Sequence, residues 1–455
     1  MKLPEEFKNR MCGMLKEEYA AFEASYECKS SRALRLNPNK AREDFLKHPP
    51  FALEAVPWAK NGYYYEEGSL PGKHPYHAAG VYYIQEPSAM APAEYLCAKP
   101  GERILDLCAA PGGKTTQIAA HMQGKGILIS NEIHPARAKI LSENVERMGI
   151  GNVIVTNETP KKLSEIFTGY FDKILVDAPC SGEGMFRKNE AACEEWSLSQ
   201  VQICAQRQDE ILSYAAQMLR CGGRIVYSTC TFAPEENEGT VSRFLKKFPE
   251  FDICPVKKID KMTGGNPQWV SGASDKMKDT VRLFPHKLRG EGHYLAVLEK
   301  KEGANQNQEI FSMAETGIPE KNLCLFTTFW KENLIQKPEG IYLAFGENLY
   351  LAPKQTPPLK GLKILRPGLH LGTNKKNRFE PSHALALFLK ENEVCRSINY
   401  SADSDEIRAY LNGQSISCEG EKGWYVVLAD GYSIGWGKLS GGMLKNHYPK
   451  GLRRP

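Results

Sequence analysis

Residues 104–116 read Ile104-Leu-Asp-Leu-Cys-Ala-Ala-Pro-Gly-Gly-Lys-Thr-Thr116, an apolar run followed by small residues and then by a helix-forming segment. Small residues let backbone amides approach a ligand closely, and the amino end of a helix adds partial positive charge. The stretch therefore predicts a strand, a turn and a helix that together form a ligand cradle. Because glycine-rich turns between a strand and a helix also occur without a ligand, a purely structural turn is the alternative.

Two nucleotide-binding patterns are absent from this cradle. A triphosphate-binding loop needs a glycine five residues before its last glycine, and Cys108 stands there. The dinucleotide fingerprint G-x-G-x-x-G is missing as well. Glu132 ends the next predicted strand, 26 residues after Asp106, where an acid can accept both hydroxyls of a ribose. Its alternative role is an acid at a helix start. Together, the cradle and Glu132 favour S-adenosylmethionine over NAD or ATP.

The pattern around the cradle predicts the fold class. From about residue 81, short apolar runs alternate with helical segments, which is typical of βαβ units and a mostly parallel sheet. We therefore expect an α/β fold with a Rossmann-like sheet. The first 80 residues predict an amphipathic helix over 5–26 and no chemistry. The predicted strands are 103–107, 126–131, 152–156, 172–176 and 223–228, with a late antiparallel partner at 293–299.

Four units are expected along the chain. They are an N-terminal RNA-binding or accessory region over 1–80, the domain of the cradle and predicted sheet over 81–302, an intermediate basic domain over 310–380 and a C-terminal domain over 381–455, with a polar boundary at 302–309. Residues 353–379 carry seven Lys or Arg and no acid, and residues 431–455 carry five more without an acid. Clustered cations suit contacts with a polyanion, and solvated charge on an ordinary domain is the alternative.

The whole-chain composition excludes several classes of protein. Of the 455 residues, 42% are apolar and 25% are charged, which rules out wholesale disorder and a disulfide-rich miniprotein. The thirteen cysteines are an odd number without a C-x-x-C pair or zinc-type spacing, so we expect reduced thiols, a cytoplasmic protein and no metal site. No signal core and no run of about 18 apolar residues occurs, so no membrane contact is expected. The net charge of +5 permits a polyanionic partner.

Two cysteines follow predicted strands. The fourth strand runs into Asp177-Ala-Pro-Cys180-Ser-Gly, and the fifth ends in Tyr-Ser-Thr-Cys230-Thr. Carboxyl ends of strands bind ligands in open α/β sheets. A lone cysteine is more often a small buried apolar residue, but two of them beside a cofactor cradle suggest chemistry.

In a protein that binds S-adenosylmethionine, the reaction that calls for a thiol is methylation of a pyrimidine at carbon 5, and we expect the two cysteines to serve it. This carbon is a poor nucleophile, and a thiolate that adds at carbon 6 makes it electron-rich. Asp177 is placed to protonate or hydrogen-bond the ring nitrogen and so stabilise the adduct. The alternative for Asp177 is an aspartate that only orders its own loop.

Four motifs in order resemble those of the Nol/Nop/Sun (Fmu) family of RNA cytosine-5 methyltransferases, over about residues 81–300. They are Asp-Leu-Cys-Ala-Ala-Pro-Gly-Gly-Lys-Thr, Asp-Ala-Pro-Cys-Ser-Gly, Tyr-Ser-Thr-Cys-Thr and Pro-Glu-Glu-Asn-Glu. The resemblance implies that Cys230 is the nucleophile, that Cys180 assists product release and that Asp177 lies next to the reacting groups. The residues alone do not rank the two thiols. We interpret most of the run 234–238, Pro-Glu-Glu-Asn-Glu, as helix-start chemistry.

The same resemblance implies a set of cofactor contacts. For S-adenosylmethionine they are Cys108, Ala109, Ala110, Pro111, Gly112, Gly113, Lys114, Glu132 and Asp177. The family usually has an acid near the adenine, 18 positions before Asp177, where this chain has Thr159. Asn157 or Glu158 is expected to substitute there, so Asn157, Glu158 and Thr159 are all candidates.

The length and the added C-terminal half resemble the bacterial RsmF-like branch of the family. Its members modify ribosomal RNA and carry a C-terminal module similar to the PUA fold, with which residues 430–437 are compatible. The resemblance implies an α+β, RNA-binding C-terminal half and a small α/β N-terminal region. The expected function is S-adenosylmethionine-dependent cytosine-5 methylation of RNA, with 16S ribosomal RNA or the small ribosomal subunit as partner. Its alternatives are a tRNA or DNA cytosine-5 methyltransferase and a non-catalytic RNA-binding ribosome assembly factor.

Overall fold

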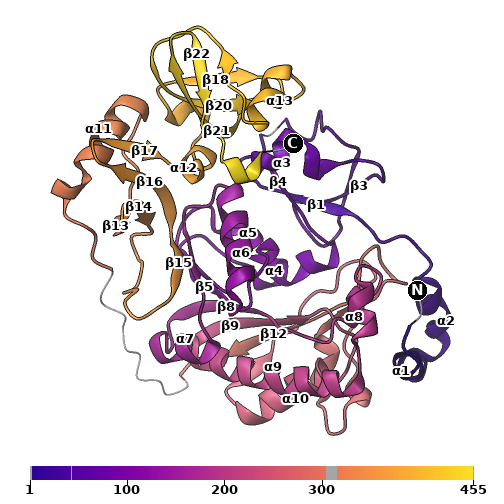
Figure 1. Ribbon diagram of the computed structural model, residues 1–455. Coiled ribbons are helices and arrows are strands. Elements are labelled where there is room, and N and C mark those ends of the chain that lie inside the picture. Colours follow the sequence, from indigo (N-terminus) through magenta and orange to yellow (C-terminus); the bar gives the residue numbers. More distant parts are fainter. Residues whose placement is uncertain (1–2, 43, 304–314, 454–455) are drawn as a thin grey trace.

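The computed structural model describes residues 3–42, 44–303 and 315–453 (Figure 1). The predicted polar boundary at 302–309 lies outside the described residues from 304 onward. Among the helices of these three ranges, none is long and apolar enough to cross a membrane.

The N-terminal part consists of short helices and a small antiparallel sheet. Its helices are α1 (Glu5–Leu15), α2 (Tyr19–Ala24) and α3 (Pro75–Ala78), and its strands β1 (Ala33–Leu36), β2 (Leu53–Ala55), β3 (Gly62–Tyr65) and β4 (Tyr82–Ile84) pair in the order β2-β3-β1-β4. The single helix predicted over 5–26 is wrong, because Lys16 has a φ of 51° and separates α1 from α2. The break lets Phe7 and Phe22 pack into one buried cluster.

The central sheet has nine strands. Five parallel strands form its middle: β5 (Arg103–Asp106), β6 (Ile127–Asn131), β7 (Val153–Thr156), β8 (Phe171–Asp177) and β9 (Leu219–Thr229). Four more extend it: β12 (His293–Lys300) is antiparallel to β9, β10 (Phe251–Ile253) and β11 (Val281–Leu283) pair with β12, and β15 (Ile364–Pro367) is antiparallel to β7. All five predicted parallel strands and the late antiparallel partner are confirmed, with ends displaced by a few residues.

The strand order places a crevice at the carboxyl ends of β5 and β8. The sheet runs β10-β12-β9-β8-β5-β6-β7-β15, so the chain passes from β5 out through β6 and β7 and then returns to the other side of β5. Such a reversal leaves a crevice between the two diverging connections, where open α/β sheets bind ligands. The cradle follows β5 and Asp177 ends β8, so both predicted features lie at this crevice.

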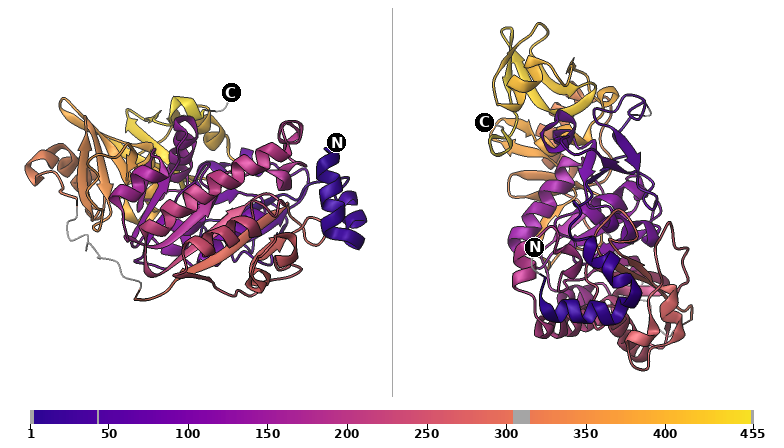
Figure 2. Two further views of the ribbon diagram at one scale, coloured as in Figure 1. Left: turned by 90° about the horizontal axis from the view of Figure 1, so that it is seen from below. Right: turned by 90° about the vertical axis from the view of Figure 1, so that its right-hand side faces the viewer.

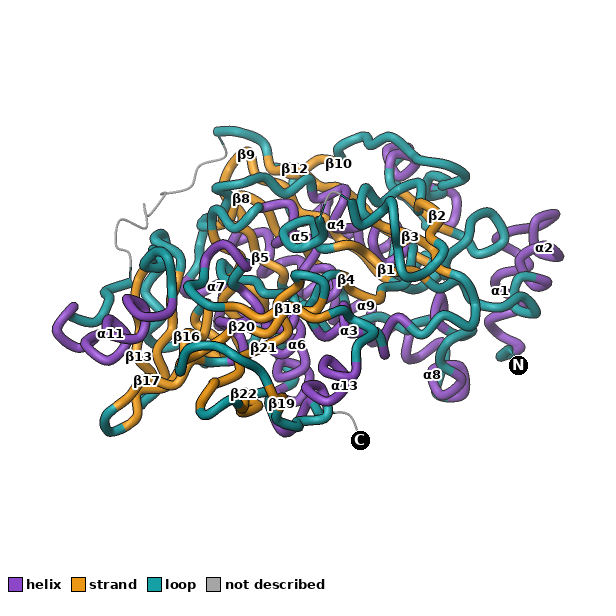
Figure 3. Tube along the Cα trace, turned by 90° about the horizontal axis from the view of Figure 1, so that it is seen from above, coloured by secondary structure: helices purple, strands orange, loops and turns teal. Residues whose placement is uncertain are grey.

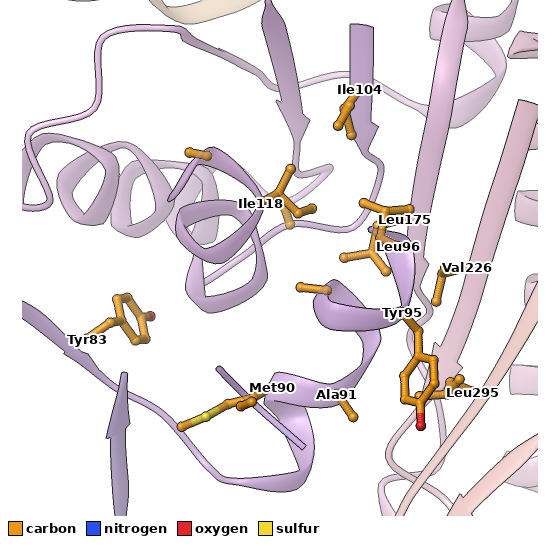
Figure 4. Packing of buried hydrophobic residues seen from close by; sticks show 14 of the residues in the cluster. Tyr83, Met90, Ala91, Tyr95, Leu96, Ile104, Ile118, Leu175, Val226 and Leu295 are labelled. Carbon is orange, nitrogen blue, oxygen red and sulfur yellow. The ribbon is translucent and has the colours of Figure 1, made fainter. Parts of the chain in front are cut away.

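Helices cover both faces of the central sheet. They are α4 (Ala91–Leu96), α5 (Gly113–Met122) and α6 (Pro135–Arg147) on one face and α7 (Pro160–Ile166), α9 (Leu198–Met218) and α10 (Glu238–Lys247) on the other, with the short α8 (Glu190–Glu194) beyond β8. Ile104 and Leu175 enter one buried cluster, where Figure 4 shows them beside Ile118 of α5. Their strand neighbours Leu105 and Ile174 enter the other cluster. A parallel sheet covered in this way is buried on both sides.

Two further sheets form the C-terminal half. The strands β13 (Ile341–Phe345), β14 (Asn348–Ala352), β16 (Leu369–Lys375) and β17 (Arg378–Pro381) make an antiparallel sheet, and β18 (Ser397–Tyr400), β19 (Ile416–Ser417), β20 (Gly423–Ala429), β21 (Tyr432–Ser440) and β22 (Met443–Asn446) make a mixed one. The helices here are α11 (Cys324–Asn333), α12 (His383–Phe388) and α13 (Asp405–Leu411). Phe329, Leu371 and Trp436 share one buried cluster that joins the two sheets. The α+β expectation for this half is confirmed.

The N-terminal sheet packs against the C-terminal half of the chain. The Tyr76 hydroxyl donates to Asp430 Oδ2 at 2.9 Å, and Tyr82 and Tyr432 belong to one buried cluster. Helices α1 and α2 lie at the opposite end of the molecule from α11 (Figures 2 and 3). Short 3-10 turns complete the described chain: η1 (Lys16–Glu18), η2 (Pro71–Lys73), η3 (Ser88–Met90), η4 (Glu183–Met185), η5 (Pro267–Trp269), η6 (Asp275–Asp279), η7 (Glu320–Leu323), η8 (Glu391–Glu393) and η9 (Lys450–Leu452).

Much of the predicted basic stretch 353–379 is neutralised by acids from elsewhere in the chain. Four of its seven cations form ion pairs: Lys354 with Glu339 at 2.6 Å, Lys375 with Glu347 at 3.1 Å, Arg378 with Glu380 at 2.7 Å, and Arg366 with Glu146. The last pair is largely buried and ties β15 to α6. Lys360, Lys363 and Lys376 have no acidic partner among the described residues.

Candidate active site

The turn between β5 and α5 depends on two glycines. Gly112 has a φ of 111°, which residues with a side chain rarely adopt. A Cβ atom on Gly113 would lie 3.3 Å from both Tyr83 and the Gln85 amide. The turn therefore keeps a close backbone approach at the amino end of α5, as the sequence predicts.

Asp106 lies directly beneath this turn with one oxygen unsatisfied. It is fully buried, its Oδ2 accepts a hydrogen bond from Thr115 Oγ1 at 2.6 Å, and its Oδ1 has no partner within the described parts of the chain. Burial raises the pKa of Asp106 to about 7. An unpaired carboxylate oxygen under a turn of small residues fits a polar ligand that brings hydrogen-bond donors, as S-adenosylmethionine does with its amino group and ribose.

Arg35 of the N-terminal sheet holds the first turn of α5. Its guanidinium is buried and donates to the Gly113 carbonyl at 3.1 Å, to Thr116 Oγ1 at 2.7 Å and to Gln85 Oε1 at 3.0 Å. The expectation of no chemistry in residues 1–80 therefore misses a residue that supports the cradle. The available signal was an arginine inside the apolar strand Ala33–Leu36.

Glu132 lies at the end of β6 beside the cradle. Its side chain is 4% exposed, its Oε1 accepts from the His134 backbone amide at 2.9 Å, and Arg137 lies 3.6 Å from Oε2. The backbone amide of Ala109 in the cradle donates to the Asn131 carbonyl at 2.8 Å, which ties the two segments together. The structure thus brings the predicted ribose acid and the predicted turn to one crevice.

The three candidates for the adenine position differ in what their side chains bind. Asn157 Nδ2 donates to the backbone carbonyls of Glu132 and Ile133 at 2.6 and 2.9 Å, so this side chain lies against the backbone of the predicted ribose acid. Glu158 Oε1 instead accepts from the Lys363 backbone amide at 2.8 Å, and Thr159 caps α7 by accepting from the Lys162 amide. Asn157 is therefore the candidate that faces Glu132.

Asp177 and Lys114 form an ion pair in the crevice. Lys114 Nζ lies 2.7 Å from Asp177 Oδ2, and Ser228 Oγ donates to Asp177 Oδ1 at 2.7 Å. Burial alone would raise the pKa of Asp177, but the positive charge of Lys114 outweighs it and lowers that pKa. Burial would likewise lower the pKa of Lys114, and Asp177 reverses that shift. Both groups are therefore charged at neutral pH.

The two predicted thiols lie side by side. Cys180 Sγ and Cys230 Sγ are 3.4 Å apart, and each cysteine is partly exposed. The hydrogen bond with Cys230, followed by burial, raises the pKa of Cys180 well above its usual range. The loops that carry them are joined by a hydrogen bond of 2.8 Å between the hydroxyls of Ser181 and Thr231. This bond holds the two loops, and with them the two thiols, together at one side of the crevice.

The interpretation of residues 234–238 as helix-start chemistry is wrong for Glu236 and Asn237. Both are completely buried ahead of α10, and their side chains fix the loops that carry the thiols. Glu236 Oε2 accepts from the Ser181 amide at 3.1 Å, and Asn237 Nδ2 donates to the Thr231 carbonyl at 2.9 Å. Glu238 does begin α10, but it pairs with the buried Arg282. These side chains support the site rather than only capping a helix.

A Rossmann-like sheet with a small-residue cradle and a buried acid, Glu132, at its switch point is typical of S-adenosylmethionine-dependent methyltransferases. Sequence profiles match most of the chain. The profile of 16S rRNA methyltransferase RsmB/F matches residues 93–299, and those of the RsmF N-terminal domain, first C-terminal domain and PUA domain match 3–87, 328–389 and 397–454. The chain belongs to the ribosomal RNA small subunit methyltransferase F family. Its C-terminal PUA domain, predicted from the resemblance, is confirmed.

Individual relatives agree with this membership. The chain is 30% identical to the ribosomal RNA small subunit methyltransferase F of Erwinia tasmaniensis, with 99% of this chain and 97% of the relative covered. It is 31% identical to the protein of the same name from Vibrio vulnificus, with 93% and 91% covered.

Solved structures share the central fold. A methyltransferase homologue from Pyrococcus horikoshii is 30% identical with a TM-score of 0.59, over 65% of this chain and 95% of that one. NSun6 from the same organism, solved with SFG, shares the fold at a TM-score of 0.54 and 23% identity, over 65% of this chain and 98% of that one.

Proposed function

We propose that this protein methylates carbon 5 of cytosine in small-subunit ribosomal RNA through a covalent adduct with Cys230. The observation that carries the proposal is the pair of thiols 3.4 Å apart, beside the Lys114–Asp177 pair and the cofactor crevice. A methyltransferase that acts on a nitrogen or an oxygen needs no thiol, whereas carbon 5 of cytosine needs a nucleophile at carbon 6.

The first step is attack by the Cys230 thiolate. A bond forms between Sγ and carbon 6, and the electron pair of the double bond between carbons 5 and 6 moves to carbon 5 and into the ring. The ring nitrogen N3 takes up a proton, and the ionised Asp177 accepts a hydrogen bond from that N–H group. Lys114, 2.7 Å from Asp177, keeps the carboxylate charged and is the proton carrier in reach.

The second step restores the ring. Bound S-adenosylmethionine contributes an electrophilic methyl group, to which carbon 5 is reactive only in the adduct. The carbon 5 proton then passes to solvent and the N3 proton returns to Lys114, so the electron pair at carbon 5 re-forms the double bond and expels Cys230 as a thiolate. Cys180 assists this release, because its Sγ lies 3.4 Å from the leaving sulfur and its raised pKa keeps the thiol protonated until the adduct forms.

We also propose how the cofactor and the RNA are held. The turn 108–114 and Glu132 hold S-adenosylmethionine, and Asn157 is the adenine-side candidate because it lies against Glu132. The PUA domain at 397–454 and the names of the relatives support ribosomal RNA as substrate. Because carbon 5 is inaccessible in a stacked helix, the target cytidine is presented in a loop or flipped out.

The decisive test compares three cysteine variants on small-subunit ribosomal RNA. Cys230→Ala should abolish methylation, and Cys180→Ala should accumulate a covalent protein–RNA adduct that survives a denaturing gel. Cys324→Ala is the matched control, because Cys324 is exposed on α11 and should leave both readouts unchanged. Normal methylation by Cys230→Ala would show that the nucleophile is wrong, and absence of any adduct with Cys180→Ala would remove its release role.

The rival substrates are separated by matched RNA and DNA oligomers and by bisulfite sequencing. In cells lacking this protein, ribosomal RNA should lose specific 5-methylcytosine positions while tRNA keeps its own. Loss confined to tRNA, or methylation of DNA alone, would redirect the substrate. Tight RNA binding without turnover would identify a non-catalytic assembly factor instead.

A further inference from the structure

His293 lies at the reaction crevice without an assigned task. It is the first residue of β12, and its neighbour Tyr294 pairs with Thr229 on β9. The two strands are antiparallel, so His293, which precedes Tyr294, and Cys230, which follows Thr229, lie at the same end of the strand pair. The side chain of His293 is 4% exposed, and its Nε2 lies 3.9 Å from Asp177 Oδ1. The imidazole is thus buried beside the groups proposed to bind the target base.

The backbone around His293 is fixed by close packing. A Cβ atom on the preceding Gly292 would lie 2.2 Å from the Phe232 ring and 2.8 Å from Gly184, so side chains are excluded there. Arg187 Nε donates to Glu291 Oε2 at 2.8 Å, and the Glu291 amide donates to Glu86 Oε1 at 2.8 Å. These contacts hold the start of β12 in register and leave the imidazole little freedom.

The ring presents an unused hydrogen-bond acceptor. Nε2 has no hydrogen-bond partner among the described residues, although it is buried. Burial, with the nearby charge of Lys114, lowers the pKa of His293 to about 4, so the ring is neutral at neutral pH. The backbone of Gly292 acts on the same pKa in the opposite direction, as a carbonyl that accepts from the ring does, and this fits a neutral ring with its N–H on Nδ1 and its acceptor at Nε2. A buried acceptor without a donor is costly unless a ligand supplies one.

Two other roles fit less well. An imidazole that is neutral down to about pH 4 is too weak a base to remove the carbon 5 proton efficiently. A separation of 3.9 Å from Asp177 is too long for a hydrogen bond that would orient the carboxylate. What remains is an acceptor facing the same space as Asp177.

We propose that His293 Nε2 accepts a hydrogen bond from the 4-amino group of the target cytosine and so selects this base against pyrimidines that lack the amine. Cytosine carries a two-hydrogen donor at position 4, where uracil carries an acceptor. Asp177 Oδ1 and His293 Nε2 are two acceptors 3.9 Å apart, a spacing that one amino group with two diverging hydrogens can span. This assignment rests on the proposed cytosine-5 function and names its specificity-determining residue.

The test is a thermodynamic cycle that combines substitution of His293 with removal of the 4-amino group of the target base. An RNA fragment of the small subunit is prepared with either cytosine or pyrimidin-2-one, which lacks the 4-amino group, at the position mapped by bisulfite sequencing. Single-turnover transfer of tritiated methyl from S-adenosylmethionine is measured with the full-length wild type, His293→Leu and His293→Gln. Glutamine keeps an acceptor near the position of Nε2, whereas leucine removes it.

The expected result is a loss confined to the pair of interacting groups. Wild type should transfer about 10-fold or more slowly to pyrimidin-2-one, since a hydrogen bond to a buried acceptor is worth roughly a factor of ten. His293→Leu should slow transfer to cytosine by a similar factor and leave pyrimidin-2-one unchanged, while His293→Gln should keep the wild-type preference within about threefold. Equal slowing of both bases by His293→Leu would overturn the proposal.

The experiment distinguishes failure of this inference from failure of the proposed function. If the wild type forms no 5-methylcytosine, the proposed function fails and the inference with it. If the wild type is active and His293→Leu keeps the full wild-type preference for cytosine over pyrimidin-2-one, only the inference fails. Thermal unfolding shows whether His293→Leu is folded. If it is not, His293→Phe replaces it, because phenylalanine keeps a ring of similar shape without the acceptor, and the same loss or survival of the preference for cytosine is then measured.

Discussion

The Arg282–Glu238 ion pair of the catalytic part is buried, whereas the Lys375–Glu347 pair of the C-terminal half remains in solvent. The side chains of Arg282 and Glu238 are 1% and 0% exposed, and they pair through two hydrogen bonds of 2.8 and 2.5 Å. Lys375 and Glu347 are 43% and 67% exposed in their pair.

The difference shows what the same residue types do in two settings. A buried pair fixes geometry, because either charge left alone in the interior is costly. Arg282 also donates to the Phe232 carbonyl at 3.0 Å, two residues after Cys230, so its pair with Glu238 supports the loop of the proposed nucleophile. An exposed pair contributes little to stability, and its cation stays available to a phosphate group.

The largest effect is expected for the pair nearest the chemistry. Asp177→Asn removes the charge that Lys114 balances and that we propose favours the protonated ring nitrogen, so single-turnover methylation should fall by about 100-fold or more. Asp405→Asn is the matched control, because Asp405 pairs with Arg408 on the exposed side of α13 and should leave the rate unchanged. A rate within about threefold of wild type for Asp177→Asn would contradict the proposed role of the Lys114–Asp177 pair.

Glu238→Gln measures how much the buried Arg282–Glu238 pair contributes to the stability of the fold. It leaves Arg282 in the interior without a counter-charge, and the free energy of unfolding should fall by about 3–5 kcal/mol in urea titrations. Glu347→Gln makes the same change in the exposed pair and should cost at most about 1 kcal/mol. Equal losses in the two variants would remove the distinction between the two regions.

Glu236 provides a smaller, pH-dependent comparison within the catalytic part. Burial, with the nearby charge of Glu183, raises the pKa of Glu236 to about 7. The folded protein thus binds this proton more tightly than the unfolded chain, so the associated stability is full below about pH 4.5 and is lost as the pH rises through 7.

Glu236→Gln should therefore flatten the fall in unfolding free energy between pH 5 and pH 8, by roughly 1–2 kcal/mol. Chemical denaturation of wild type and variant at both pH values measures this difference. An identical pH dependence in the two proteins would show that Glu236 is ionised throughout the range.

The smallest effect on stability is expected from the exposed lysines of the C-terminal half. Lys360→Ala and Lys376→Ala remove cations that have no acidic partner in the described chain, so unfolding should shift by less than about 0.5 kcal/mol. If this surface contacts RNA, each variant should weaken the binding of all RNA sequences to a similar extent. The slope of log binding constant against log salt concentration should fall by about one. Unchanged salt dependence in both would place the RNA elsewhere.

Local patterns in the sequence predict the central sheet and the cradle well. Apolar runs of strand length between helical segments predict all five parallel strands, and the small residues 108–113 predict the turn that Gly112 and Gly113 require. Both features arise from residues close together in the chain, so composition and spacing contain the information.

Features that depend on distant residues escape such patterns. Arg35 supports α5 across about 80 residues of sequence, and the acids paired with the basic stretch 353–379 include Glu146, far upstream on α6. Glu236 and Asn237 follow a pattern typical of a helix start, and only their tertiary contacts show that they fix the thiol loops. The break at Lys16 likewise reflects the shared packing of Phe7 and Phe22.

The edge strand β15 has a consequence for how the protein is made. It completes the central sheet beside β7, with Ile364 opposite Thr156, about 210 residues later in the chain. At ribosomal rates of ~5–20 residues per second, β7 waits roughly 10–40 s for this partner. During synthesis β7 is therefore an apolar edge open to pairing with other chains, and a nascent chain released before residue 364 would carry that edge permanently. Through β15, the C-terminal half thus also protects the catalytic sheet from aggregation once synthesis is complete.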